Sequence, residues 1–251
     1  MRPPVDHIAA PPFPLKLRWI NSKPLRLDQL AGEPVLLEFW DFCRPNSIRT
    51  LPYVRGWHER YAGAGLQVIG VHTSGFEPSN DPDAVVAAVE RLSVPYPVVV
   101  DAEFEIWQLY GNLGWPARYL FNQDARLAEY HYGEGGYADT ELAIQELLSL
   151  GDAPDVLDAI RPEDEPGAVL APQSEDRLEP PFDGPYEAGG VWAVLDGHGT
   201  VTANGVEHIV DHPGAYELIE YDRSTAGELE LQVDAGVNCY GVSFTPGLAR
   251  S

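Results

Sequence analysis

The spacing of apolar residues changes once along this chain, close to residue 180, and that change limits the folds the chain can adopt. Up to about residue 150, short apolar runs alternate with segments whose apolar residues recur every three or four positions. The runs suit buried strands and the longer spacing suits helices with one buried face. After residue 180 the period becomes two, typical of half-buried strands. We therefore expect an α/β domain followed by a small all-β, sandwich-like domain.

The first region has the alternation of strands and helices that builds a sheet flanked by helices. Residues 35–42, VLLEFWDF, form an apolar run interrupted by acids, the pattern of a buried central strand. A helix is expected directly after it, over about 45–64. The other expected strands cover 19–21, 66–72, 97–101, 118–122 and 127–132, and the other helices cover 81–92, 104–110 and 140–150.

Proline and acidic residues mark the boundaries. Residues 1–14 contain five prolines and are expected to be an irregular lead-in. Residues 15–150 form the α/β domain. Residues 151–180 hold five prolines and nine acids against two arginines, which indicates a linker with at most one helical turn. Residues 181–251 form the β domain.

The chain carries a formal charge of −23, with 39 acids against 16 bases. Nucleic acids and anionic membranes attract clustered cations, so neither is an expected partner. No run reaches the roughly 18 apolar residues of a membrane-spanning helix, and the N-terminus lacks the apolar core of a signal peptide. We expect a soluble, cytoplasmic protein with a strongly solvated acidic surface.

The two cysteines, Cys43 and Cys239, are the only thiols. Cytosolic thiols stay reduced, so we expect two free thiols rather than a disulfide. Two cysteines without nearby histidines do not form a zinc site, and His208 and His212 lie on strand and turn residues rather than on one helix face. No glycine-rich phosphate loop is present. Neither a metal nor a cofactor is expected.

Four blocks in the first domain resemble one family. They are EFWDFCRPNSIRTLPYVRGWHERY, VIGVHTSGFE, GWPARYLFNQDARL and HYGEGGYADTELAIQELL, in that order. Together they resemble the thioredoxin-like redoxins of the TlpA/DipZ type over about residues 15–150. HPGAYELIEYD and GVNCYGVSFTPG resemble, more faintly, the β-sandwich that follows thioredoxin in DipZ-like proteins. The resemblance implies a thioredoxin-like sheet and thiol–disulfide oxidoreductase chemistry.

The family carries a Cys-x-x-Cys pair that this chain lacks. Counting back from Pro52, the two family positions fall on Arg44 and Ser47. In another register Cys43-Arg44-Pro45-Asn46 mimics Cys-Gly-Pro-Cys, with Asn46 in place of the second cysteine. Either way no dithiol exists, so no internal thiol can resolve a mixed disulfide.

Cys43 is nevertheless a candidate nucleophile. It precedes the N-terminus of a helix, Arg44 adds positive charge beside it, and Ser47 or Asn46 offers a hydrogen bond. These features predict a lowered thiol pKa, and the thiolate is the reactive form.

The resemblance adds further site residues. It implies a cis peptide bond at Trp115-Pro116, with the main chain of Trp115 presented to an extended substrate. It also places a buried carboxylate at Glu38, whose raised pKa would suit a general base toward Cys43.

The preferred interpretation is a monothiol oxidoreductase in which Cys43 attacks a low-molecular-weight thiol adduct or a protein disulfide and an external thiol resolves the product. The alternatives are a non-catalytic thioredoxin-fold binding protein and a one-cysteine peroxiredoxin-like peroxidase, for which Arg44 or Arg118 would serve the thiolate. The resemblance implies a carbohydrate-binding type of sandwich for the β domain. A structural or homodimerising role is kept beside it, because Trp192 is its only tryptophan.

Overall fold

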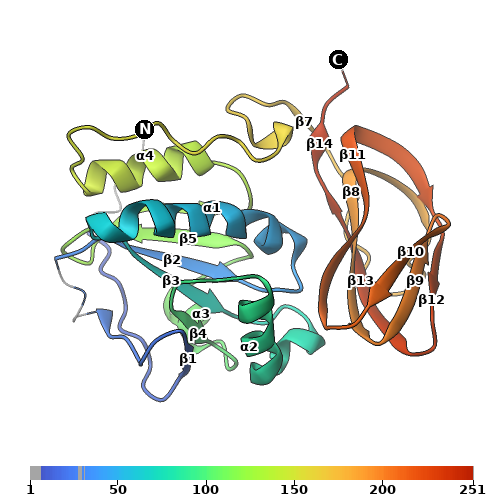
Figure 1. Ribbon diagram of the computed structural model, residues 1–251, viewed down its shortest axis with the longest axis horizontal. Coiled ribbons are helices and arrows are strands. Elements are labelled where there is room, and N and C mark those ends of the chain that lie inside the picture. Colours follow the sequence, from blue (N-terminus) through green and yellow to red (C-terminus); the bar gives the residue numbers. More distant parts are fainter. Residues whose placement is uncertain (1–6, 28–29, 31, 251) are drawn as a thin grey trace.

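The computed structural model describes residues 7–27, 30 and 32–250 and shows two lobes side by side (Figure 1). The first lobe is an α/β domain built on a six-stranded sheet of order β1-β4-β3-β2-β5-β6. Strands β2, β3 and β4 run parallel, whereas β1, β5 and β6 pair antiparallel. The strands are β1 (Arg18–Ile20), β2 (Val35–Trp40), β3 (Gln67–His72), β4 (Val98–Val100), β5 (Ala117–Phe121) and β6 (Leu127–Tyr132).

Each face of this sheet is buried by a different set of elements. Apolar side chains of α1, α2 and α4 share one hydrophobic cluster with one face, and α3 with the N-terminal segment packs on the other. The helices are α1 (Pro45–Tyr61), α2 (Pro82–Arg91), α3 (Glu105–Leu109) and α4 (Tyr137–Leu147), and 3-10 turns are η2 (Ala62–Ala64) and η3 (Glu77–Asn80). The helix expected over 45–64 thus ends in a 3-10 turn, and the helix expected from 140 begins at Tyr137.

Local sequence explains where α1 begins. Pro45 lies at the first helical position, where its fixed φ suits a helix and its missing N–H costs no hydrogen bond. Arg44 precedes it in extended conformation as the N-cap residue, with φ −105° and ψ 116°. The helix therefore starts immediately beyond the carboxyl end of the central strand β2.

The second lobe is an antiparallel β-sandwich. Sheet β11-β8-β13 packs against sheet β10-β9-β12 around a third hydrophobic cluster. Trp192 is only 7% exposed, so it is not a surface platform for a sugar. The strands are β8 (Gly184–Gly197), β9 (Gly199–Ala203), β10 (Val206–Val210), β11 (Gly214–Leu229), β12 (Leu231–Val233) and β13 (Val237–Thr245), with a short pair of β7 (Leu170–Ala171) and β14 (Gly247–Leu248) beside them.

The proline-rich segment 151–180 is fastened to the first lobe rather than extended through solvent. It contains the 3-10 turn η4 (Pro162–Asp164). Tyr53 donates its hydroxyl proton to Asp164 at 2.7 Å, and Arg49 pairs with Glu163 at 2.9 Å. The acids of this segment therefore serve partly as partners for α1.

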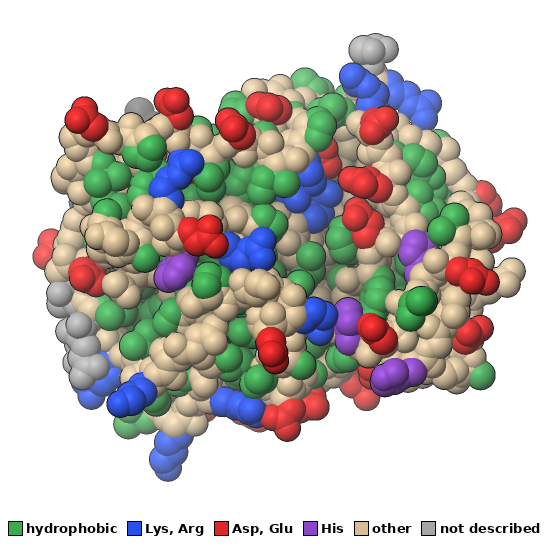
Figure 2. Space-filling view, in the orientation of Figure 1, with side chains coloured by type: hydrophobic (Ala, Val, Ile, Leu, Met, Phe, Trp, Pro, Cys, Tyr) green, Lys and Arg blue, Asp and Glu red, His purple; other side chains and the backbone are tan. Residues whose placement is uncertain are grey.

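The remaining acids are spread over the surface. Figure 2 shows carboxylates distributed across the visible face of both lobes rather than gathered in one patch. Within the described residues, no helix combines the length and the apolar character needed to cross a membrane.

Candidate functional site

The N-terminus of α1 faces the second lobe, and Arg44 is the side chain that stands there. Its guanidinium carbon lies 4.5 Å from the centre of the Phe76 ring and 4.9 Å from that of Trp115. Guanidinium groups stack favourably on aromatic faces at such distances. The two rings therefore hold Arg44 in place, at the position where one of the two registers expects the family's first cysteine.

The aromatic wall around Arg44 is itself anchored. The peptide bond between Trp115 and Pro116 is cis. The Trp115 indole N–H donates to the Thr73 carbonyl at 2.8 Å, and its ring lies 4.3 Å from that of Trp107. Trp115 is thus fixed by one hydrogen bond and one ring contact.

Asp41 organises the main chain beneath Arg44. One carboxylate oxygen accepts the Cys43 N–H at 2.9 Å, and the other accepts the Gly75 N–H at 2.7 Å. The Asp41 N–H donates to the Ser47 hydroxyl oxygen at 3.2 Å, and His72 Nε2 lies 3.6 Å from the carboxylate. The hydroxyl of Ser47 therefore supports the turn, at the position where one of the two registers expects the second cysteine.

Cys43 lies in the hydrophobic cluster beneath α1 and is 0% exposed. Part of its cover comes from the second lobe: Val194 belongs to the same cluster, Tyr240 packs against it, and the Ala215 N–H donates to the Phe42 carbonyl at 3.2 Å. The two lobes thus close over the thiol.

This burial corrects the expectation of a lowered thiol pKa. Burial, and then the negative charge of Asp41, raise the pKa of Cys43, and this outweighs the opposing effects of Ser79, Arg91 and Arg44. The helix N-terminus and Arg44 were expected to prevail. They do not, because the thiol is buried and the charge with the largest effect on it is the Asp41 carboxylate.

Glu38 is buried elsewhere on the same face of the sheet. Burial raises its pKa to about 8, while a hydrogen bond from the Tyr96 hydroxyl at 3.0 Å and the charge of Arg118 act in the opposite direction. Its other oxygen is buried without a partner. The groups that act on Glu38 are therefore different from those that act on Cys43, so these interactions do not support Glu38 as a base toward the thiol.

Arg118 also belongs to this second environment. It lies opposite Glu38 in the strand register, stacks 4.9 Å from the Tyr137 ring and donates to the Gly135 carbonyl. The arginines whose charges act on Cys43 are Arg91 and Arg44. Arg118 is therefore not placed as the arginine of a peroxidase site.

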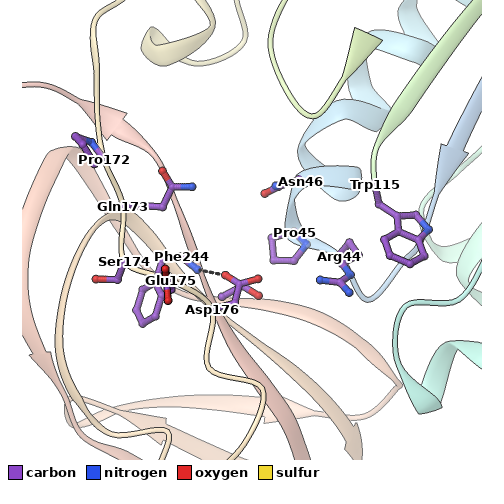
Figure 3. A pocket seen from close by; sticks show the side chains of 11 residues that line it. Arg44, Pro45, Asn46, Trp115, Pro172, Gln173, Ser174, Glu175, Asp176 and Phe244 are labelled. Atoms are coloured by element: carbon purple, nitrogen blue, oxygen red, sulfur yellow. Dashed lines mark hydrogen bonds between the residues drawn. The ribbon is translucent and has the colours of Figure 1, made fainter. Parts of the chain in front are cut away.

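A cleft of about 450 Å³ opens between the lobes at Arg44 (Figure 3). Arg44, Pro45, Asn46 and Trp115 form one wall. Segment 172–176 with Ser243 and Phe244 forms the other. The Ser243 hydroxyl is buried without a partner, and Ser243 is only 4% exposed. An Asp176 carboxylate oxygen accepts the Phe244 N–H at 3.3 Å.

Of the residues expected at the site, the structure brings Arg44, Pro45, Asn46 and Trp115 to the cleft and leaves Cys43 beneath it. Sequence reasoning missed the opposite wall, because segment 172–176 carried no motif beyond its acidic and polar composition. It also missed Asp41, whose position two residues before the cysteine was the only available signal.

A central parallel strand leading into a helix, with a cis-proline segment beside the start of that helix, defines a thioredoxin-like fold. Two solved structures share it. A putative thiol:disulfide interchange protein DsbE from Chlorobium tepidum has a TM-score of 0.50 and 20% identity, over 56% of this chain and 95% of its own. The thioredoxin-like superfamily protein SPOA0173 has a TM-score of 0.52 and 23% identity, over 58% and 97%.

Sequence comparison finds similar proteins over the same region. Residues 8–130 match the AhpC/TSA family. The chain is 34% identical over 165 residues to protein DipZ of Mycobacterium tuberculosis (strain CDC 1551 / Oshkosh), and 26% identical over 132 residues to the thiol-disulfide oxidoreductase YkuV of Bacillus subtilis (strain 168). The N-terminal domain is therefore similar to thioredoxin-like redoxins in both sequence and fold.

These matches differ in extent. The DipZ match covers 62% of this chain but only 24% of that protein, whereas the YkuV match covers 52% of this chain and 88% of YkuV. The thioredoxin-like domain is thus the part shared with YkuV, and the chain spans about a quarter of DipZ.

Proposed function

We propose that this chain is a non-catalytic binding protein built on a thiol–disulfide oxidoreductase fold, and that the cleft at Arg44 binds a small polar ligand. One observation carries the proposal. The only thiol of the domain, Cys43, lies fully buried beneath the cleft, and Arg44 stands at the cleft instead, where one register of the resemblance expects the first cysteine.

The chemistry of the buried thiol supports this reading. An ordinary thiol with a pKa of about 8.5 is a few per cent thiolate at pH 7, and the thiolate is the species that attacks a disulfide. Burial raises the pKa of Cys43, so its thiolate population falls further. Steric access falls with it, because side chains of the second lobe complete the cover.

No second thiol is available to resolve a mixed disulfide. Ser47 is buried, and its hydroxyl accepts the Asp41 N–H. Cys239 packs with the core of the sandwich, and its Sγ lies 3.7 Å from the Gly241 carbonyl oxygen. Both cysteines are free thiols.

Monothiol chemistry at Cys43 is the second candidate. Relatives named thiol-disulfide oxidoreductases and the positive charges of Arg91 and Arg44 near the thiol favour it. It requires the lobes to separate so that a low-molecular-weight thiol adduct or a protein disulfide reaches Cys43, and it requires an external thiol to release the product.

Alkylation distinguishes the two candidates. Cys239→Ser protein is treated with iodoacetamide at pH 7, and modification of Cys43 is followed by mass spectrometry against a cysteine-containing model peptide. We expect Cys43 to react at least about tenfold more slowly than the peptide, because its thiolate is both scarce and covered. A rate equal to or above that of the peptide contradicts the binding-protein proposal and supports the monothiol reaction.

A further inference from the structure

Arg44 presents a cation that pairs directly with no other group in the part of the chain that the structure describes. Within the described residues its guanidinium makes ring contacts but no hydrogen bond or ion pair, and its Nε is buried without a partner. The nearby Asp41 carboxylate is engaged with the backbone N–H groups of Cys43 and Gly75. A guanidinium held rigidly with unused donors is preorganised for a carboxylate, which it binds through two parallel hydrogen bonds.

The facing wall supplies a second unused polar group. Ser243 lines the cleft, is 4% exposed, and its hydroxyl has no hydrogen-bond partner among the described residues. Leaving a buried hydroxyl unsatisfied is costly, so a ligand that reaches it gains a hydrogen bond and removes that cost. The Asn46 side chain also points toward the cleft (Figure 3).

The same wall carries negative charge. Glu175 and Asp176 line the cleft and are exposed to solvent. Figure 3 shows Asp176 across the cleft from Arg44. A simple anion would be attracted by Arg44 but repelled by these carboxylates. A simple cation would be attracted by the carboxylates but repelled by Arg44. Only a ligand that carries both charges is complementary to both walls.

We propose, on the basis of the binding function above, that the ligand is a zwitterion of amino-acid or short-peptide class. Its carboxylate pairs with Arg44, and its ammonium group lies against Glu175 and Asp176. The volume of about 450 Å³ falls within the range of small-molecule sites, so a dipeptide is of suitable size.

A charge-matched panel of peptides tests this assignment. The dipeptide Ala-Ala, its N-acetyl form and its C-terminal amide are titrated into the full chain by calorimetry. We expect Ala-Ala to bind, and each blocked form to bind about tenfold more weakly, since each loses one charge pair.

Substitutions test which wall of the cleft binds each charged group of the ligand. Arg44→Gln should weaken Ala-Ala about tenfold and remove the difference between Ala-Ala and its amide. Asp176→Asn combined with Glu175→Gln should remove the difference between Ala-Ala and its N-acetyl form. Lys16→Gln and Asp152→Asn alter exposed charges outside the cleft lining and should change nothing.

The outcomes separate this inference from the proposed function. If the three peptides bind equally well, the cleft does not discriminate between charged and blocked termini. The binding function then stands and the zwitterion inference fails. If no peptide binds while Cys43 remains inert to iodoacetamide, the inference fails alone. If no peptide binds and Cys43 reacts as fast as a model peptide, both fail.

Discussion

The seam between the two lobes has a closed half and an open half, and they meet at consecutive residues. The closed half lies over Cys43, where Val194, Ala215 and Tyr240 contribute apolar cover and a backbone hydrogen bond. The open half lies at Arg44, where the facing wall is polar and a cleft remains. A shift of one residue thus separates a sealed thiol from an accessible cation.

That difference agrees with the proposed binding function. Arg44 is the N-cap residue of α1, beyond the carboxyl end of β2, so its guanidinium adds to the positive potential of the helix N-terminus. Positive potential that would stabilise a thiolate is equally suited to a bound carboxylate. The second lobe adds two features to this arrangement. Its side chains cover the thiol, and its segment 172–176 forms the second wall of the cleft.

The largest expected effect comes from breaking the closed half. Val194→Asp places a carboxylate in a fully buried apolar position. An unpaired buried charge costs about 3–5 kcal/mol, so we expect the lobes to separate or the free energy of unfolding to fall by that amount. Iodoacetamide should then modify Cys43 at least about tenfold faster, because the covered state is less populated.

Val206→Asp is the matched control for this variant, since Val206 is 57% exposed on the distal sheet and should tolerate the charge. Circular dichroism establishes whether the Val194→Asp protein is folded, and Tyr240→Asp offers a second substitution at the same half of the seam. A folded Val194→Asp or Tyr240→Asp protein in which Cys43 reacts as slowly as in the unmodified chain would show that the second lobe does not seal the thiol.

A smaller effect is expected from Glu38, whose carboxyl group lies outside both halves of the seam. Its folded pKa is raised from 4.5 to about 8, so the folded chain binds more protons than the unfolded chain between those values. The free energy of unfolding should therefore fall as the pH rises from about 4.5 to about 8, by the order of a few kcal/mol in total. Glu38→Gln, which stays neutral, should remove this dependence.

Urea unfolding at several pH values measures this slope. The two proteins should differ least near pH 4.5, and the variant should gain stability relative to the unmodified chain toward pH 8. Glu103→Gln alters an exposed loop carboxylate and should keep the original slope. If Glu38→Gln retained the full slope, Glu38 would already be ionised in the folded state.

The part of this architecture that local pattern encodes was predictable. The apolar run ending at Trp40, followed by Pro45 and apolar residues at helical spacing, is enough to place β2 and α1. The two-residue spacing of apolar residues likewise distinguishes the second lobe. These features depend on neighbours within a few residues of one another.

The environment of the site could not be predicted in this way. Cys43 shares a hydrophobic cluster with Val194, and Tyr240 packs against that cluster. These residues are about 150 and 200 positions away from Cys43 in the sequence, and the spacing of apolar residues does not reveal such long-range packing. Segment 151–180 was interpreted as a linker for the same reason. Its composition is acidic and proline-rich, yet Glu163 and Asp164 find their partners on α1.

The smallest effect is expected in the open half, at Gly75. A Cβ on this residue would lie 2.7 Å from Arg44 Nε and 3.0 Å from an Asp41 carboxylate oxygen. Contacts this short require a shift, and the Arg44 side chain, which among the described residues is held by ring contacts alone, can move more easily than the backbone. Gly75→Ala should therefore cost only about 1 kcal/mol of stability. Because the guanidinium would leave its position between Phe76 and Trp115, Ala-Ala should bind several-fold more weakly.

Gly63→Ala is the control for that substitution, since nothing lies within 4 Å of the added Cβ. Calorimetric titration with Ala-Ala gives the affinity, and iodoacetamide labelling reports on the closed half in the same samples. Weaker binding with unchanged protection of Cys43 would show that the two halves of the seam are independent, as their separate contacts imply. Unchanged binding would mean that the stacking of Arg44 does not set the position of its charge. Loss of both binding and protection would mean that the stacked guanidinium also helps to hold the lobes together.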